Sequence, residues 1–228
     1  MADNYMENSD VKQLGYVGFK TLIASHSPAA ALFAELLGWA IESPWDKRRE
    51  DLLLYLYNRL RVLEEKQEVN LKELSKSDEF IDVLTQAVAL SVRASQEEKI
   101  NALRNTVINT ATNLRGDHTK RLIFLTKIES FTEWHIILLR FLFNPQLYYH
   151  QIGKEMPNYV SINLYTIIED AIPYFKNEED LISVIWQDLY SARFITTSEE
   201  KAMLTAKGAF AKRTTLLGDE FLAFISAN

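Results

Sequence analysis

Cysteine and histidine are two residue types often used in catalysis and metal binding, and this chain has no cysteine and only four widely spaced histidines. The sequence has no cysteine, so it offers neither a thiolate nucleophile nor a thiolate metal ligand. Its four histidines are His26, His118, His135 and His150. None is paired with another histidine or a carboxylate at the spacing common in metal sites. We therefore expect no metal or other cofactor, and we interpret His135 as a helix cap or a half-buried residue.

Motifs for nucleotide binding and for hydrolysis are also missing from the sequence. It contains no G-x-G-x-x-G, no Walker loop and no G-x-S-x-G. Neighbouring carboxylates occur at Glu64/Glu65, Glu97/Glu98, Glu178/Glu179/Asp180 and Glu199/Glu200. Adjacent residues of a helix point to different sides, so these groups are expected to be solvated. We expect the chain not to be an enzyme, and a dispersed carboxylate site remains the catalytic alternative.

Three groups of residues are candidates for binding rather than catalysis. The first is cationic and has no acid between its ends: Lys201, Lys207, Lys212 and Arg213. The second is the run Lys47, Arg48 and Arg49, which could hold an acidic partner, although cations are disfavoured at the positive end of a helix. The third is the pair Tyr148 and Tyr149, because tyrosine rings are common in protein interfaces.

The composition indicates which elements must position these residues. Apolar residues make up 47% of the 228 positions and charged residues 25%, as in ordinary globular proteins. Seven glycines and five prolines supply few turns, so the chain is predicted to be mainly α. The net charge of −6 disfavours broad contact with nucleic acid. A protein partner or self-association is the expected mode of contact.

The order of elements predicts two domains. Residues 1–10 are expected to form a flexible tail, residues 11–115 a helical domain, and residues 116–228 a second helical domain, because Gly116 and Asp117 stop one helix and open the next. The apolar stretch 14–41 is broken at residues 25–28, and the uncharged run 21–34 within it falls short of the roughly 20 residues that a bilayer span needs. We expect no membrane span, and the lack of a secretory signal favours the cytoplasm.

The last fifty residues change pattern in a way that resembles a winged helix. Residues 177–193 have the apolar spacing of a helix, and residues 194–197 are predicted to form a strand. Residues 203–206 and 214–215 flank Lys207 and Gly208 as in a β-hairpin, and residues 217–225 are predicted to form a closing helix. The expected architecture is therefore a helical N-terminal domain followed by a winged-helix-like domain.

Two passages carry a resemblance to a named family. They are the run S-D-E-F that leads into E-E-K-I-N-A-L-R-N, and the run L-I-F-L that leads through I-E-S-F-T into H-I-I-L-L. Over about residues 46–143 they resemble Abi-alpha-like proteins, a family of bacterial helical proteins linked by name to abortive infection. The resemblance implies a setting in phage defence or stress, and it brings no catalytic residue.

These features lead to one expected function and one main alternative. A winged helix can bind DNA through its wing, here residues 201–213, which would make the chain a transcriptional regulator. The helix that would enter the groove is acidic, however: Glu178, Glu179, Asp180 and Asp188 all lie within it. Phosphates repel such a helix. We therefore favour a non-enzymatic protein that acts through protein contacts.

Overall fold

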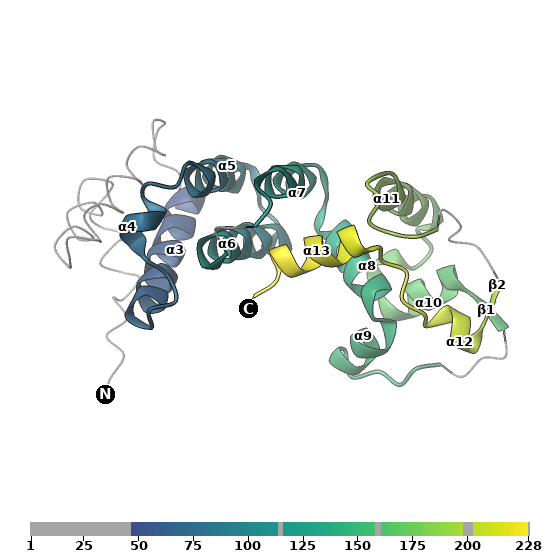
Figure 1. Cartoon of the computed structure of the whole chain (residues 1–228). Helices are drawn as coiled ribbons and strands as arrows, with labels where there is room; N and C mark the ends of the chain where they lie inside the picture. Colours follow the sequence, from purple (N-terminus) through teal and green to yellow (C-terminus); the bar gives the residue numbers. More distant parts are fainter. Residues whose placement is uncertain (1–46, 114–115, 158–160, 198–202, 228) are drawn as a thin grey trace. The chain divides into compact units, whose positions relative to one another are not determined.

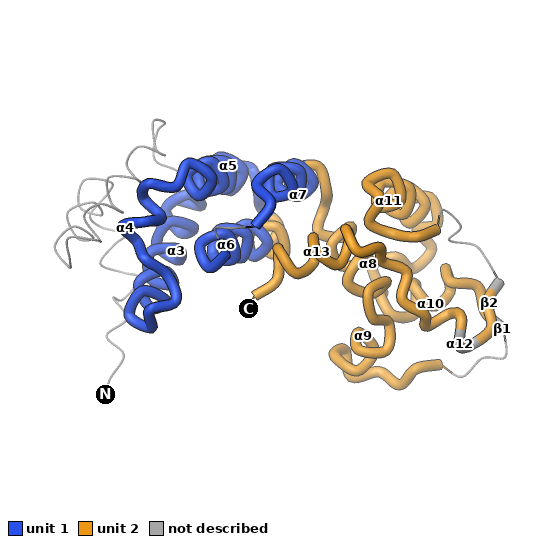
Figure 2. Tube along the Cα trace, in the orientation of Figure 1, with its two compact units in different colours: residues 1–95, 100–129, 228 blue, residues 96–99, 130–227 orange. Residues whose placement is uncertain are grey.

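The computed structural model describes residues 47–113, 116–157, 161–197 and 203–227. This part of the chain is mainly helical, as predicted, and contains one small antiparallel sheet of two strands near the C-terminus (Figure 1). The chain divides into two compact units (Figure 2). Unit 1 comprises residues 1–95 and 100–129 together with residue 228, and unit 2 comprises residues 96–99 and 130–227.

Unit 1 is built from amphipathic helices. They are α3 (Lys47–Glu65), α4 (Leu71–Leu74), α5 (Asp78–Arg93), α6 (Glu97–Thr112), whose first turn belongs to unit 2, and α7 (His118–Ser130). Leucines on α3 recur at three- and four-residue spacing, and Leu53, Leu56 and Leu60 are fully buried. Helix α3 packs against α5, whose Phe80 and Leu84 are equally buried. Burial of these stripes holds the helices together.

Unit 2 has shorter elements in a more varied order. They are α8 (Glu133–Phe143), α9 (Pro145–Gln151), β1 (Ser161–Asn163), α10 (Leu164–Ala171), the 3₁₀ turn η1 (Pro173–Phe175), α11 (Glu179–Ser191), β2 (Met203–Thr205), α12 (Ala206–Ala209) and α13 (Leu216–Ile225). Helix α8 contacts α9, α11 and α13. An aromatic cluster supports this core, because the ring of Phe194 lies 5.9 Å from that of Phe131 and 4.7 Å from that of Phe221.

Two of the helices predicted in the last fifty residues are confirmed. The segment predicted at 177–193 is α11, which buries Ile182, Ile185 and Leu189 on one face. The closing helix is α13, and the side chain of Thr215 caps its start by accepting a hydrogen bond from the backbone N–H of Gly218 at 3.1 Å.

The predicted β-hairpin around Lys207 and Gly208 is wrong. Strand β2 pairs with β1, with Ile162 opposite Leu204, and not with residues 214–215. The reason is local: Thr205 Oγ1 accepts a hydrogen bond from the N–H of Gly208 at 3.3 Å, which caps α12 and places the expected turn inside a helix. Thr214 instead forms an isolated bridge with Ile195, so residues 194–197 make no strand.

Several expectations concern residues outside the described ranges. The tail 1–10 and the apolar stretch 14–41 both lie there. Within the described ranges, no helix combines the length and the apolar character that crossing a membrane requires. The domain boundary predicted between residues 115 and 116 falls inside unit 1, and it stays a prediction.

Candidate functional site: a groove in unit 2

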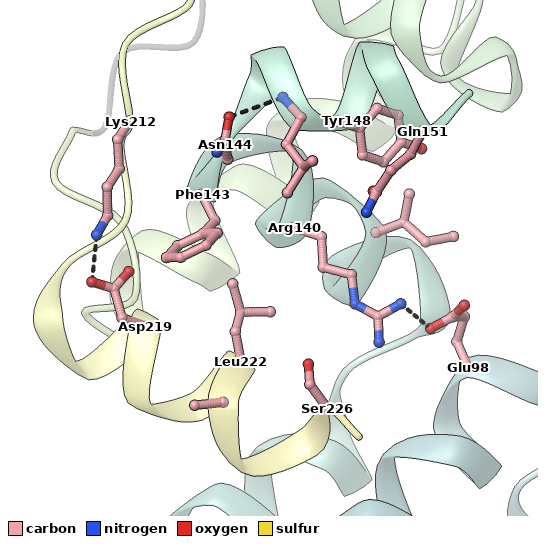
Figure 3. A pocket seen from close by; sticks show the side chains of 13 residues that line it. Glu98, Arg140, Phe143, Asn144, Tyr148, Gln151, Lys212, Asp219, Leu222 and Ser226 are labelled. Atoms are coloured by element: carbon pink, nitrogen blue, oxygen red, sulfur yellow. Dashed lines mark hydrogen bonds and ion pairs between the residues drawn. The ribbon is translucent and has the colours of Figure 1, made fainter. Parts of the chain in front are cut away.

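Unit 2 contains an open groove of about 850 Å³ between α8, α9 and α13 (Figure 3). Its volume is within the range typical of ligand sites. Apolar side chains and two ion pairs line it, and the apolar ones include Ile137, Phe143, Leu147 and Leu222. Exposed apolar surface and charged groups meet in this groove, so we consider it the candidate site.

Helices α8 and α9 form one wall because of the break between them. Asn144 ends α8, and its Oδ1 accepts a hydrogen bond from the N–H of Leu147 at 2.9 Å, which caps α9. Pro145 occupies the first position of α9, where its missing N–H costs nothing. Leu147 and Gln151 are four residues apart and share one face of α9, and both line the groove together with Phe143.

Helix α13 forms the opposite wall. Leu222, Ala223 and Ser226 lie three, four and seven residues after Asp219, and all four residues line the groove. The other face of the helix is in the core, where Phe221 and Ile225 are fully buried. One helix thus anchors the unit with one face and shapes the groove with the other.

Each of two cations in the groove is paired with an acid. Arg140 Nη1 lies 2.6 Å from Glu98 Oε2, and Lys212 Nζ lies 2.5 Å from Asp219 Oδ2. Lys212 also lies over the ring of Phe143, 4.8 Å from its centroid. These pairs are partly exposed, so each adds little to stability on its own. Each pair joins one positive and one negative side chain, so these two pairs add no net charge to the groove.

The mouth of the groove exposes large apolar side chains. Phe143 is 38% exposed and Leu147 is 47% exposed. Tyr148, on the same wall, is half-buried, and desolvation raises the pKa of its hydroxyl, with the charge of Arg140 acting in the opposite sense. The hydroxyl is therefore neutral at physiological pH and can donate a hydrogen bond. The groove offers an apolar contact with polar groups at its margins, as binding sites do.

Lys212 lies in this groove, but its neighbour Arg213 does not. Arg213 is buried, and its guanidinium donates to the carbonyl oxygens of Gly208 (2.6 Å), Ala209 (3.1 Å) and Ala211 (2.7 Å). Burial lowers the pKa of this guanidinium from its ordinary value. Arg213 therefore holds the end of α12 in place and does not reach a partner at the surface.

The remaining cationic candidates are Lys201, Lys207, Lys47, Arg48 and Arg49. Lys207 belongs to α12, and Lys201 lies outside the described ranges. In unit 1, Lys47 and Arg48 are exposed at the start of α3, where Arg48 Nη1 donates to the carbonyl oxygen of Val92 at 2.8 Å, whereas Arg49 is buried. The three adjacent cations of α3 therefore face different surroundings.

The two adjacent tyrosines also have different roles. Tyr148 lines the groove, whereas Tyr149 is fully buried. The Tyr149 hydroxyl donates to Asp170 Oδ2 at 2.9 Å and also lies 3.3 Å from the Ile167 carbonyl oxygen, tying α9 to α10. Successive residues of a helix point about 100° apart, which separates a groove residue from a core residue.

Sequence reasoning identified Lys212 and Tyr148 but missed the rest of the groove. Glu98 was expected only to be solvated, and Arg140 and Asp219 were not singled out. Phe143 and Leu147, on either side of a helix break, were not singled out either. One signal was available: a break at Asn144 and Pro145 reorients the chain, so apolar residues on both sides of it can share a surface.

A second polar cluster lies at the start of α8. His135 is buried, its ring stacks on that of Phe131, and its Nε2 lies 3.2 Å from Asp188 Oδ2. Its Nδ1 accepts the backbone N–H of Thr132 at 3.1 Å and also lies 2.9 Å from Thr132 Oγ1. The order Asp, His, Thr matches the residue types of a catalytic triad, but here Nδ1 caps a helix. His135 is a capping residue, as predicted.

Within the described ranges, no group of three or more histidine or carboxylate side chains is arranged to hold a metal ion. Comparison with models of known families, with curated proteins and with solved structures finds no match for this chain.

Proposed function

We propose that this chain acts by binding a protein, without catalysing a reaction, and that the groove of unit 2 is its contact surface. The observation that carries the proposal is the exposure of Phe143 and Leu147 at the mouth of a groove lined on both sides by helices. Apolar side chains at the mouth of such a groove are what an amphipathic helix of a partner contacts.

The charges of the groove support a protein partner over nucleic acid. Arg140 and Lys212 are each held by an acid, so a phosphate would have to compete with Glu98 and Asp219. Nucleic-acid affinity depends on several cations that converge on phosphates. Of the four cations proposed for a wing, Lys212 is paired and Arg213 is buried. DNA binding therefore remains the weaker alternative.

Two further parts of the proposal concern fold and setting. The order β1, α10, α11, β2 supports a winged-helix-like interpretation of unit 2, because two helices followed by a returning strand are part of that arrangement. We propose a bacterial setting in phage defence or stress response, which rests on the resemblance to Abi-alpha-like proteins. Location in the cytoplasm belongs to the same proposal.

Site-specific photo-crosslinking in bacterial cells tests the contact surface. A photoreactive phenylalanine analogue replaces Leu147 in one variant and Val184 in a matched control. Val184 is 58% exposed on α11 and does not line the groove. We expect a protein adduct from position 147 and none from position 184, because only the first lies at the proposed interface.

Two results would contradict the proposal. One is the absence of any protein adduct at position 147 under conditions in which the variant is folded and present. The other is tight binding of duplex DNA at physiological salt that is lost in a Lys201→Ala/Lys207→Ala variant, since those changes leave the described groove residues in place. The second result would favour the regulator.

A further inference from the structure

We propose that the partner of the groove is a second copy of this chain, with Leu216 of each copy inserted into the groove of the other. This inference rests on the proposed function and names the partner. Leu216 is 75% exposed, more than any other large apolar side chain in the described part of the chain. Exposing a leucine to this extent forgoes the free energy of burial unless a partner covers it.

The position of Leu216 places it beside the groove. It occupies the first turn of α13, three residues before Asp219 and seven before Ala223, which both line the groove. Residues at this spacing share one face of a helix. Leu216 therefore continues the groove-lining stripe of α13 by one turn while standing outside the groove itself. A protruding side chain next to a matching hollow is the arrangement that a two-fold contact requires, because each copy supplies both parts.

The charges of the surface fit a second copy in the same way. A surface of one sign repels an identical surface, whereas this groove carries two cations and two acids in adjacent pairs. Across a two-fold axis, Lys212 of one copy can approach Asp219 of the other without bringing like charges together. The apolar residues Phe143 and Leu147 then surround the inserted leucine. The exposed leucine, the groove beside it and the balanced charges are together the features that pairing of the surface with a second copy requires.

Mass measurement in solution provides the first test. The full chain is studied by light scattering coupled to size exclusion, from roughly 1 to 100 µM, where interfaces of modest size associate. We expect a mass rising to twice 26.3 kDa. Leu216→Glu should remain monomeric, whereas Val184→Glu should associate like the unchanged chain. Glutamate is favourable in the first turn of a helix, so loss of association would not come from a weakened α13.

Disulfide formation gives a second, positional test. Because the chain has no cysteine, a single introduced cysteine reports only its own contacts. A Leu216→Cys chain mixed with a Leu147→Cys chain should form mixed disulfides much faster than a Val184→Cys chain mixed with the same partner. The bond needs the two Cα atoms within about 7 Å, which random collisions rarely provide.

Three results would overturn this inference. The unchanged chain could be monomeric throughout the concentration range, Leu216→Glu could associate normally, or the two disulfide rates could be equal. A monomeric chain that still forms an adduct with a different protein from position 147 would refute self-association and leave the proposed function standing. A monomeric chain that also forms no protein adduct from position 147 would refute the groove as a contact surface.

Discussion

Asp188 on α11 and His135 on α8 are joined by a hydrogen bond of 3.2 Å between Oδ2 and Nε2. On the other side of the ring, Nδ1 accepts the backbone N–H of Thr132. A backbone N–H can only donate, so Nδ1 carries no proton and the proton of the neutral imidazole is on Nε2. The same ring thus caps α8 and links it to α11.

This linkage predicts loss of stability in mild acid. Burial lowers the pKa of His135 below its ordinary value of 6.5, the hydrogen bond and charge of Asp188 raise it in part, and Lys99 lowers it. The unfolded chain therefore binds this proton at a higher pH than the folded chain. The contribution of His135 to stability is complete above pH 6.5 and is lost as the pH falls from there towards the folded pKa.

Denaturant titrations at a series of pH values between 5 and 7.5 measure this effect. The unchanged chain should lose free energy of unfolding below pH 6.5, and His135→Gln should show a smaller loss over the same interval. His118 and His150 are present in both proteins and serve as internal controls. If the free energy of unfolding fell equally steeply with pH in both proteins, the burial of His135 would not determine the pH dependence.

Replacing Arg213 should destabilise unit 2. Arg213→Ala removes three hydrogen bonds from a buried guanidinium to carbonyl oxygens at the end of α12, of which the Gly208 oxygen also accepts the backbone N–H of Ala211. We expect a loss of about 2–4 kcal/mol in the free energy of unfolding, measured by urea denaturation. Arg93→Ala is the control: that side chain is 82% exposed, and the change should cost less than about 0.5 kcal/mol. If Arg213→Ala left the free energy of unfolding unchanged, the guanidinium would have to lie at the surface.

Gly218 is predicted to tolerate no side chain. A Cβ at this position would overlap the carbonyl oxygen of Phe194 and lie 3.1 Å from its carbon. Gly218→Ala should therefore cost about 1–3 kcal/mol by thermal or urea unfolding, although alanine normally favours a helix. Gly208→Ala is the matched change on α12, where the nearest atom is 3.4 Å away, and it should be neutral or slightly stabilising. Similar effects at both glycines would contradict the close approach.

The two adjacent tyrosines should respond differently to loss of the hydroxyl. Tyr149→Phe removes the hydrogen bond to Asp170 from a fully buried site, so it should lower the free energy of unfolding by about 1–2 kcal/mol. Tyr148 is a half-buried residue of the groove, so Tyr148→Phe should change the free energy of unfolding by less than about 0.5 kcal/mol. In urea denaturation, Tyr149→Phe should therefore have a lower midpoint than Tyr148→Phe. The opposite order would refute the placement of Tyr149 in the core and of Tyr148 in the groove.

Much of the helical fold could be predicted because its signals are local. Ser77 directly precedes α5, and its Oγ accepts the N–H of Phe80 at 3.2 Å, as serine commonly does at the start of a helix. The apolar spacing of α11 gave an equally direct signal. Such features need only a few neighbouring residues, so a single sequence contains them.

The sheet and the groove could not be predicted because they depend on distant residues. The partner of β2 is β1, on the far side of α10 and α11, and short strands carry little pattern of their own. Charge alone also failed to distinguish Lys212 from Arg213. The two residues differ in their surroundings after α12 ends: Lys212 pairs with Asp219, whereas the guanidinium of Arg213 donates to three carbonyl oxygens.

The pairing of β1 with β2 also has a consequence for the order of folding. It closes a long stretch of chain that contains α10, η1 and α11, and it offers only three residue pairs in return. Bringing distant segments together costs entropy before the contact repays it. We therefore expect the enclosed helices to form first and the strands to join last. The rate at which unit 2 matures would then be set by the slow encounter of its two shortest segments.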